Sequence, residues 1–214
     1  PVPASIHEVE DTFRLLGVLG IEPPPPPLCV TPSAPAVNTI QQHIAAQTES
    51  ANATIVCVHI SARKPSQRWP TQHFVDLIKQ LSAKQSAVFM LFWSPGNDDN
   101  PLHPGDDAKA CAILDASHGL PVVPYPTQTL GALIAGLSVC EYVICSDGGA
   151  MHLAAGLGKP ILCFFGNSEP SRWHPWGVPY HVLQHTSKEV TGISVEETLA
   201  AFTQLMATSS GWQG

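Results

Sequence analysis

Chemistry is most readily expected at one short turn of this sequence, Asp147-Gly148-Gly149. The turn lies between an apolar run at 142–144 and a segment of small residues from Met151 to Leu157. Glycine has no Cβ, so a ligand can approach the backbone closely there. The free N–H groups at the start of a helix, together with the helix dipole, favour phosphate. The turn therefore predicts an anion site, with a nucleotide diphosphate as the leading ligand.

His152 falls in the first turn of that predicted helix, where its imidazole could donate to a phosphate oxygen. In the same interpretation Asp147 orders the loop. A purely structural interpretation stays open, because a lone glycine pair is weak evidence. In that case Asp147 caps the helix, the glycines serve the turn, and His152 is a satisfied helix residue.

A second candidate region is the loop SARKPSQRWP at residues 61–70, which follows the apolar run at 54–60. Three of the ten Lys and Arg residues, Arg63, Lys64 and Arg68, fall within six positions. In a chain of net charge −7, this cluster favours a phosphate clamp. The alternative is a solvated loop whose Trp-Pro pair only fixes the entry to the next helix.

Two more loops follow predicted strands. The loop at 166–177 holds Trp173 and Trp176, which would form the apolar walls of a lid or a sugar-facing loop, or would pack on a neighbouring domain. The loop at 94–100 carries carboxylates that could accept hydrogen bonds from ribose, or that form an ordinary polar turn. Its residue types alone do not decide between the two.

No metal or cofactor motif is visible in the sequence. The ten histidines are scattered without ligand spacing, and no P-loop, GxSxG or HExxH motif occurs. The sequence therefore predicts neither a metal site nor a resident cofactor.

Composition narrows the class of protein. The chain has 214 residues, of which 44% are apolar, enough for one large α/β domain. The net charge of −7 argues against a nucleic-acid partner. No apolar run reaches the roughly 18 residues that a membrane helix needs, and no signal peptide is visible. We expect no integral membrane segment.

The cysteine pattern indicates a reducing compartment. Six cysteines occur, none in a CxxC pair: Cys29, Cys57, Cys111, Cys140, Cys145 and Cys163. Four of them, at 29, 57, 145 and 163, lie in apolar runs that look like strands. They are interpreted as buried free thiols rather than as disulfides or zinc ligands.

Apolar runs alternate with helical patterns along most of the chain. Strands are predicted at 28–30, 54–60, 87–93, 121–125, 142–144, a run ending at Phe165, and 180–183. Helices are predicted at 6–19, 35–47, from an N-cap at Thr71, 106–117, 129–138, 151–157, and from a capping box at Ser194 to about Met206. This order predicts an α/β fold with a doubly wound, mostly parallel sheet.

Five consecutive prolines, Pro23 to Pro27, set the first helix apart. Such a run is extended and stiff, so it is interpreted as a connector. We therefore divide the chain into an interdomain helix with its connector, residues 1–27, and a ligand-binding domain, residues 28–214. Because the chain opens with Pro1 directly on a helical pattern, we expect it to be a piece of a longer protein.

Three motifs together resemble the signature of the ADP-heptose:lipopolysaccharide heptosyltransferases, glycosyltransferase family 9. They are DGGAMHLAAGLGKP at 147–160, FFGNSEP at 164–170, and QRWP at 67–70. The helix that opens at Thr129-Leu130 also fits. The resemblance covers roughly residues 54–185, with looser similarity at 6–19.

The resemblance implies one half of a two-domain GT-B fold, the Rossmann-like carboxyl-terminal domain that binds the sugar nucleotide. It implies inverting, metal-independent transfer of a heptose-type sugar, with ADP-heptose as the first candidate donor, to a lipopolysaccharide core acceptor. The catalytic base and the acceptor site would lie in an amino-terminal domain absent from this chain, which alone would then be inactive. The resemblance implies a cytoplasmic protein, with peripheral association to the inner membrane as a further option.

Carried over position by position, the resemblance assigns two groups of residues. The donor diphosphate would be bound by Asp147, Gly148, Gly149, His152, Ser61, Arg63, Lys64, Gln67 and Arg68, and the nucleoside by Asp98, Thr127 and Gln128. Two positions depart from the family pattern, which usually has Ser or Thr in place of Gly148 and often Lys in place of Gln67. A hydroxyl is lost at the first position, and other cations of the loop would supply the charge missing at the second.

Two other functions remain open from the sequence. One is a sugar-nucleotide-binding module without transferase activity, which the two departures motivate. The other is a dinucleotide-dependent oxidoreductase, against which the absence of GxGxxG after the first strand counts.

Overall fold

Six parallel strands form one twisted sheet in the computed structural model, which describes residues 6–48, 53–100 and 104–212. Their order across the sheet is β3-β2-β1-β4-β5-β6. The strands are β1 (Thr54–His59), β2 (Ala87–Trp93), β3 (Val122–Pro126), β4 (Tyr142–Ser146), β5 (Ile161–Phe165) and β6 (Tyr180–Gln184). The predicted doubly wound α/β fold is confirmed, and every pairing is parallel.

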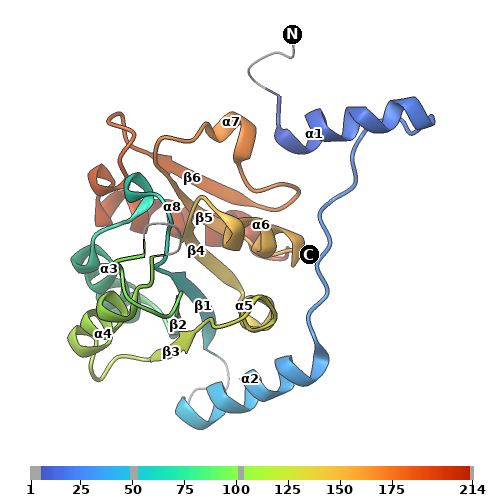
Figure 1. The fold of residues 1–214 in the computed structure, drawn as a ribbon. Coiled ribbons are helices and arrows are strands. Elements are labelled where there is room, and N and C mark those ends of the chain that lie inside the picture. Colours follow the sequence, from blue (N-terminus) through green and yellow to red (C-terminus); the bar gives the residue numbers. More distant parts are fainter. Residues whose placement is uncertain (1–5, 49–52, 101–103, 213–214) are drawn as a thin grey trace.

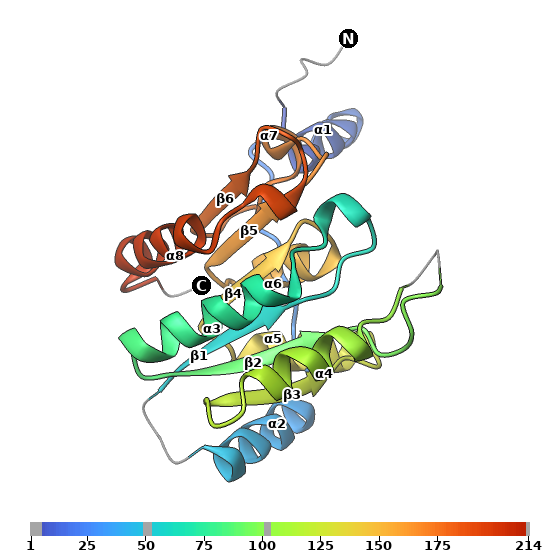
Figure 2. The same cartoon turned by 90° about the vertical axis from the view of Figure 1, so that its left-hand side faces the viewer.

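Helices cover both faces of the sheet (Figures 1 and 2). On one face lie α3 (Thr71–Lys84), α4 (Asp107–Ala116) and α8 (Val195–Ser209), and on the other lie α2 (Ala34–Gln47), α5 (Leu130–Val139) and α6 (Gly149–Gly156). Short elements complete the chain: α1 (Glu8–Phe13), α7 (Pro170–Trp173), and the 3-10 helices η1 (Arg14–Leu19), η2 (Pro65–Gln67) and η3 (Val190–Gly192).

The two helical layers explain why the strands are continuous apolar runs. All seven residues of β2 are buried, as expected for a strand covered on both faces. Successive side chains of β1 alternate between the two cores, with Val56 and Val58 on the α3 side and Cys57 on the α5 side. By the same alternation His59, the last residue of β1, lies on the side of Cys57, toward α5 and α6.

The segment at 28–30 is not a strand, which corrects one prediction. Three apolar residues after a proline run are too few to add an edge to the sheet. Val30 instead donates its backbone N–H to the carbonyl of Gly156, at 2.7 Å, so the segment runs along α6. Cys29 is therefore exposed rather than buried, whereas Cys57, Cys145 and Cys163 are buried free thiols as expected.

Several element boundaries also differ from those predicted. The helical pattern at 6–19 divides into α1 and η1, since Gly17 lowers helix propensity and the chain tightens into a 3-10 helix before Gly20. Pro70, not Thr71, holds the N-cap of α3, because the Pro70 carbonyl accepts the first helical hydrogen bonds. The capping box at Ser194 is confirmed.

The amino-terminal segment docks at its start on the α7 region and then runs along the domain to α2 (Figure 1). Arg172 makes ion pairs with Glu8, at 2.6 Å, and with Asp11, at 3.4 Å. The ring of His7 is 2.9 Å from the carbonyl oxygen of His174. The division into an interdomain helix with its connector, residues 1–27, and a ligand-binding domain, residues 28–214, stays a prediction. Within the described ranges, no helix is both long enough and apolar enough to cross a membrane.

Candidate functional site

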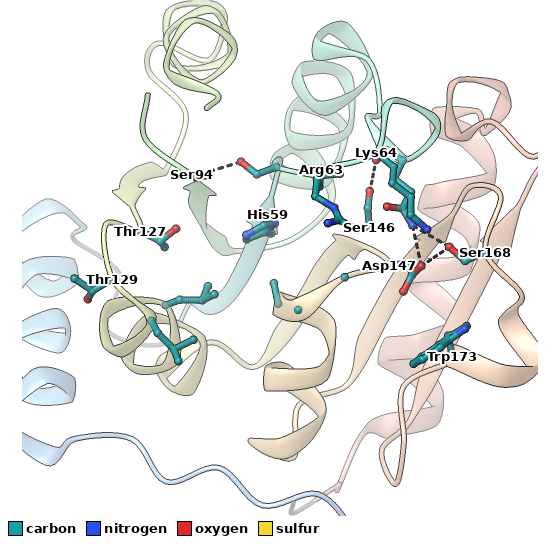
Figure 3. Close-up of a pocket in the computed structure, with 18 of the residues that line it drawn as sticks. His59, Arg63, Lys64, Ser94, Thr127, Thr129, Ser146, Asp147, Ser168 and Trp173 are labelled. Atoms are coloured by element: carbon teal, nitrogen blue, oxygen red, sulfur yellow. Dashed lines mark hydrogen bonds between the residues drawn. The ribbon is translucent and has the colours of Figure 1, made fainter. Parts of the chain in front are cut away.

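A cavity of about 1120 Å³ opens at the carboxyl ends of the strands (Figure 3). It lies at the point between β1 and β4 where the chain changes direction across the sheet, the place where ligands bind in such folds. Its lining comprises His59, Ser61, Ala62, Arg63, Lys64, Gln67, Ser94, Thr127, Gln128, Thr129, Leu130, Leu133, Ser146, Asp147, Gly148, Gly149, Ala150, Ser168 and Trp173.

The glycine turn leaves the start of α6 open to this cavity. Gly148 holds the N-cap position of α6, and Gly149 is its first residue. A Cβ built on either glycine would meet no atom within 4 Å. A ligand can therefore reach the backbone here, and the positive end of the helix dipole favours an anion.

Asp147 ties this turn to two other loops. Its carboxylate accepts a hydrogen bond from Gln67 at 2.8 Å and one from the hydroxyl of Ser168 at 2.5 Å. Gln67 also donates to the Ser168 hydroxyl, at 3.0 Å. The carboxylate thus joins the ends of β1, β4 and β5 and does not cap α6, for which no side-chain cap bond is made.

The loop after β1 is held in place from behind. Arg68 forms an ion pair with the fully buried carboxylate of Asp106 and donates to the carbonyl of Ala62 at 2.9 Å. Lys109 donates to the carbonyls of Ile60, at 3.1 Å, and Trp69, at 2.8 Å, so it clamps both ends of the loop. Arg68 is consequently a brace of the loop and lies outside the cavity lining.

The loop after β5 presses against the loop after β1. A Cβ on Gly166 would lie 2.4 Å from the carbonyl oxygen of Ser66, so only glycine permits this approach. The hydroxyl of Ser66 donates to Asn167 at 3.2 Å, and Gln184 donates to the carbonyls of Gly166 and Ser168 at 2.8 and 2.9 Å. The two loops form one wall of the cavity.

The cations of the front of the loop are free to meet a ligand. Arg63 and Lys64 are exposed and line the cavity. Ser61, just before them, accepts the backbone N–H of Ser94 at 2.8 Å, which fixes the ends of β1 and β2 together. The cavity therefore has a cationic wall facing the open N-terminus of α6.

Burial shifts the pKa of three basic groups around this site. The pKa of His59 is lowered to about 4, chiefly because burial disfavours the imidazolium, against a raising contribution from the Ser61 backbone. Burial likewise lowers the pKa of Lys109 to about 8. The pKa of His152 is lowered by burial too, with the Asp147 carboxylate acting in the opposite direction.

The structure brings together nine of the twelve residues assigned from sequence: Ser61, Arg63, Lys64, Gln67, Thr127, Gln128, Asp147, Gly148 and Gly149. The other three lie outside the lining that the described residues form. Arg68 is turned to Asp106, His152 packs near the ring of Trp173 with centroids 6.4 Å apart, and Asp98 is exposed.

The two tryptophans of the loop at 166–177 have different positions. Trp173 lines the cavity, as expected for an apolar wall. Trp176 packs instead on the ring of His7, with centroids 4.7 Å apart, and donates to the carbonyl of Pro26 at 3.3 Å. Only one of the pair can therefore contact a ligand in this cavity.

Sequence reasoning did not assign five polar lining residues to the site, His59, Ser94, Thr129, Ser146 and Ser168. Each lies at or just after the carboxyl end of a predicted strand, and that position is the signal that could have found them. No group of three or more His, Cys, Asp or Glu side chains suited to a metal ion occurs among the residues whose placement is described.

The doubly wound sheet, with its cavity at the change of direction and its open glycine turn, defines the class of Rossmann-like α/β ligand-binding proteins found in GT-B glycosyltransferases. The family follows from a direct match. The chain belongs to glycosyltransferase family 9 (heptosyltransferase), whose model matches residues 2–199.

Curated relatives agree with this family. Lipopolysaccharide heptosyltransferase 2 of Escherichia coli (strain K12) is 29% identical over 106 residues, which cover 50% of this chain and 29% of that protein. Lipooligosaccharide heptosyltransferase 2 of Haemophilus influenzae is 27% identical over 111 residues, which cover 52% of this chain and 30% of that protein. The match therefore spans less than a third of each relative's length.

Solved structures share the fold. The glycosyltransferase family 9 protein of Veillonella parvula superposes with a TM-score of 0.83 at 18% identity, over 97% of this chain and 62% of that one. The E. coli ADP-heptose lipopolysaccharide heptosyltransferase II gives a TM-score of 0.71 at 20% identity, over 89% of this chain and 57% of that one. The chain thus spans about three fifths of the length of these structural relatives.

Proposed function

We propose that this chain binds the sugar-nucleotide donor of an inverting glycosyltransferase, which moves a heptose-type sugar from ADP-heptose to a lipopolysaccharide core acceptor. The observation that carries the proposal is the meeting of three features in one cavity: the open N-terminus of α6, the exposed pair Arg63 and Lys64, and the neutral rim around Thr127 and Gln128. The first two suit a diphosphate and the third suits a nucleoside.

Two solved heptosyltransferases support the choice of donor. One structural relative from E. coli is described with ADP, at a TM-score of 0.68, and an iron-containing heptosyltransferase is described with ADP-D-beta-D-heptose, at a TM-score of 0.56. The curated relatives are named for action on lipopolysaccharide or lipooligosaccharide. These names motivate ADP-heptose as donor and a lipopolysaccharide core as acceptor here.

In the proposed reaction, negative charge builds up on the departing diphosphate as the glycosidic bond breaks. Backbone N–H groups of residues 148–150 and the cations of Arg63 and Lys64 would stabilise that charge. Donors that the fold already holds in place need little reorganisation free energy as the charge develops. With this neutralisation supplied by the protein, the proposal requires no metal ion. The acceptor hydroxyl loses its proton to a general base outside these 214 residues.

Titration calorimetry tests the donor assignment. We expect the chain to bind ADP in preference to UDP, GDP and NAD, and to lose ADP binding in the variant Gly149→Val. A Cβ at Gly149 meets no protein atom within 4 Å, so we expect the valine side chain to occupy ligand space, and circular dichroism checks the fold of the variant. Gly17→Val is the matched control, since Gly17 is equally unobstructed and lies in η1, away from the cavity.

The other results change the proposal in defined ways. Preference for UDP or GDP keeps the transferase and changes the donor, whereas preference for NAD favours an oxidoreductase. Absence of binding for all four ligands, with the fold intact by circular dichroism, contradicts a donor site in this chain.

A non-catalytic sugar-nucleotide-binding module is the second candidate, favoured by one specific contact. The carboxylate of Asp147 is paired with the neutral amide of Gln67 rather than with a cation. If ADP-heptose is bound but not turned over by the complete protein with its lipopolysaccharide acceptor, this second function replaces the first.

A further inference from the structure

His59 and Asp147 are the two titratable side chains of the described cavity lining that the proposed reaction does not use, and Asp147 is already bonded to Gln67 and Ser168. His59 ends β1, a strand otherwise made of Thr, Ile, Val and Cys, at the point where the strand leaves the core and meets the cavity. Its neighbour in register on β2 is Phe92. A polar imidazole at the end of this strand gives up the packing that an apolar side chain would provide. Its position in the cavity lining therefore calls for an explanation.

The ring of His59 lies between the two halves of the cavity (Figure 3). On one side are Ser94 and Thr127, at the ends of β2 and β3, and on the other is Arg63. The starts of α5 and α6 line the same cavity through Leu130 and Gly149. A ligand that spans from the nucleoside rim to the glycine turn would therefore come within reach of this imidazole.

Cationic groups lie around this part of the cavity. Arg63 and Lys64 line the cavity from the loop after β1, and Lys109 approaches from α4, where it bonds to the carbonyl next to His59. The N-termini of α5 and α6 add partial positive charge. The carboxylate of the lining is that of Asp147, at the end of β4, and His152 lies on α6 outside the lining.

We infer that His59 binds the diphosphate of the donor, and that it takes up a proton when the donor enters, so that its imidazolium donates to a phosphate oxygen. This inference rests on the proposed function, because it needs a nucleoside diphosphate ester in this cavity. The ligand adds negative charge to the site, and the proton comes from solvent.

The free site holds the ring neutral, which makes the uptake measurable. Burial and the nearby Lys109 charge lower the pKa of His59 to about 4. An opposite charge within hydrogen-bond reach raises a pKa by about 1–3 units. A bound diphosphate therefore raises the pKa of His59 to a value near the physiological range. Donor binding then becomes tighter as the pH falls toward that pKa.

The test uses ADP-glucose, a diphosphate diester whose own charge does not change between about pH 5.5 and about pH 7.5. For a shift of about two units, we expect the affinity of the wild-type chain to rise about fourfold over this fall in pH. Calorimetry in two buffers of different ionisation enthalpy should show proton uptake near the lower pH. His59→Gln should bind more weakly and with a flat pH profile.

Two control variants assign the proton. His118→Gln, at an exposed position after α4 and outside the cavity lining, should keep the wild-type profile. His152→Gln should keep the proton uptake as well. Uptake that persists in His59→Gln and disappears in His152→Gln overturns the inference, and so does wild-type binding that is independent of pH.

This design separates the two proposals. ADP-glucose binding with no proton uptake contradicts the role of His59 and is still consistent with the proposed donor site. No binding of ADP-glucose or ADP by the wild-type chain sinks both. Proton uptake by the wild-type chain is measured without any variant, so a failure of His59→Gln to fold does not remove the test.

Discussion

Two loops leave the centre of the sheet at the same edge, and their charged residues have different roles. The loop after β1, residues 60–70, supplies the cationic wall of the cavity. The loop after β2, described at 94–100 and 104–106, has Asp98 and Asp99 exposed, whereas Asp106 at its end and Asp107 at the start of α4 are bonded to other residues of the protein. Asp106 pairs with Arg68, and Asp107 accepts from the indole of Trp93 at 2.7 Å and from the backbone of Gly96 at 2.9 Å.

The comparison shows that charge in a loop beside a site is not by itself a contact with ligand. Asp106 and Asp107 hold the second loop and its neighbour in place. The first loop is free to present Arg63 and Lys64 because Asp106 and Lys109 hold its chain from behind. If this division is correct, substitutions at the back should change stability and substitutions at the front should change affinity.

The largest effect is expected for Asp106→Ala. It leaves the guanidinium of Arg68 without its carboxylate, and breaking a buried ion pair costs about 3 kcal/mol or more. Urea unfolding should show a fall in the free energy of unfolding of about 3 kcal/mol. Asp76→Asn, at a partly exposed acid on α3 bonded by Gln72, is the control and should change it by less than about 0.5 kcal/mol. Equal effects of the two variants would break the comparison.

Next comes the pH dependence of stability at Lys109. Its pKa is lowered to about 8 in the folded chain, below the value near 10.4 of an unfolded lysine. Between these values the unfolded state binds more protons, so folding is favoured as the pH rises. Wild type should gain about 2 kcal/mol over Lys109→Met between about pH 7.5 and about pH 10 in urea unfolding. A constant difference would mean that this ammonium is not desolvated.

A smaller effect is expected for Arg63→Gln, at the front of the loop. Loss of one exposed cation from the diphosphate site should weaken ADP-glucose binding by about 1 kcal/mol, or about fivefold. The difference should shrink at high salt, because exposed charges are screened. The unfolding free energy should stay unchanged. Arg68→Gln is the matched variant, and it should show the reverse, lower stability with little salt-dependent loss of affinity.

The smallest effect is expected for Asp98→Asn. Sequence reasoning assigned this acid to ribose, but its side chain is exposed and outside the cavity lining. ADP-glucose affinity should change by less than about twofold. A loss of about tenfold would show that the loop after β2 closes over the ligand, and it would restore the ribose role.

The sequence was informative wherever a property is local. Buried parallel strands need apolar residues at every position, so the runs at 54–60 and 87–93 could be found directly. The same rule failed at 28–30, because three apolar residues fit an extended connector as well as a strand. The glycine turn at 148–149 could be found from the sequence because glycine is favoured where a tight turn or a close ligand requires a backbone without a Cβ.

The partners of side chains were not visible, because they are set by packing between distant segments. The sequence alone could not show that Arg68 and Arg63 have different roles. In the structure, the ion pair with Asp106 holds Arg68, and not Arg63, away from the cavity. The bond of Gln67 to Asp147 joins residues 80 positions apart. His59 escaped notice since it is embedded in a strand-like run, where a histidine is more often a core residue.

The contact of Gly166 with the carbonyl of Ser66 has a consequence for protein engineering. The wall of the cavity is made of two loops that fit each other at van der Waals distance. A chimera that exchanges the loop at 61–69 between family members would therefore inherit a mismatch unless the segment at 166–168 is exchanged with it. Under the proposed function, nucleotide preference should be transplantable as a pair of loops and not as single loops.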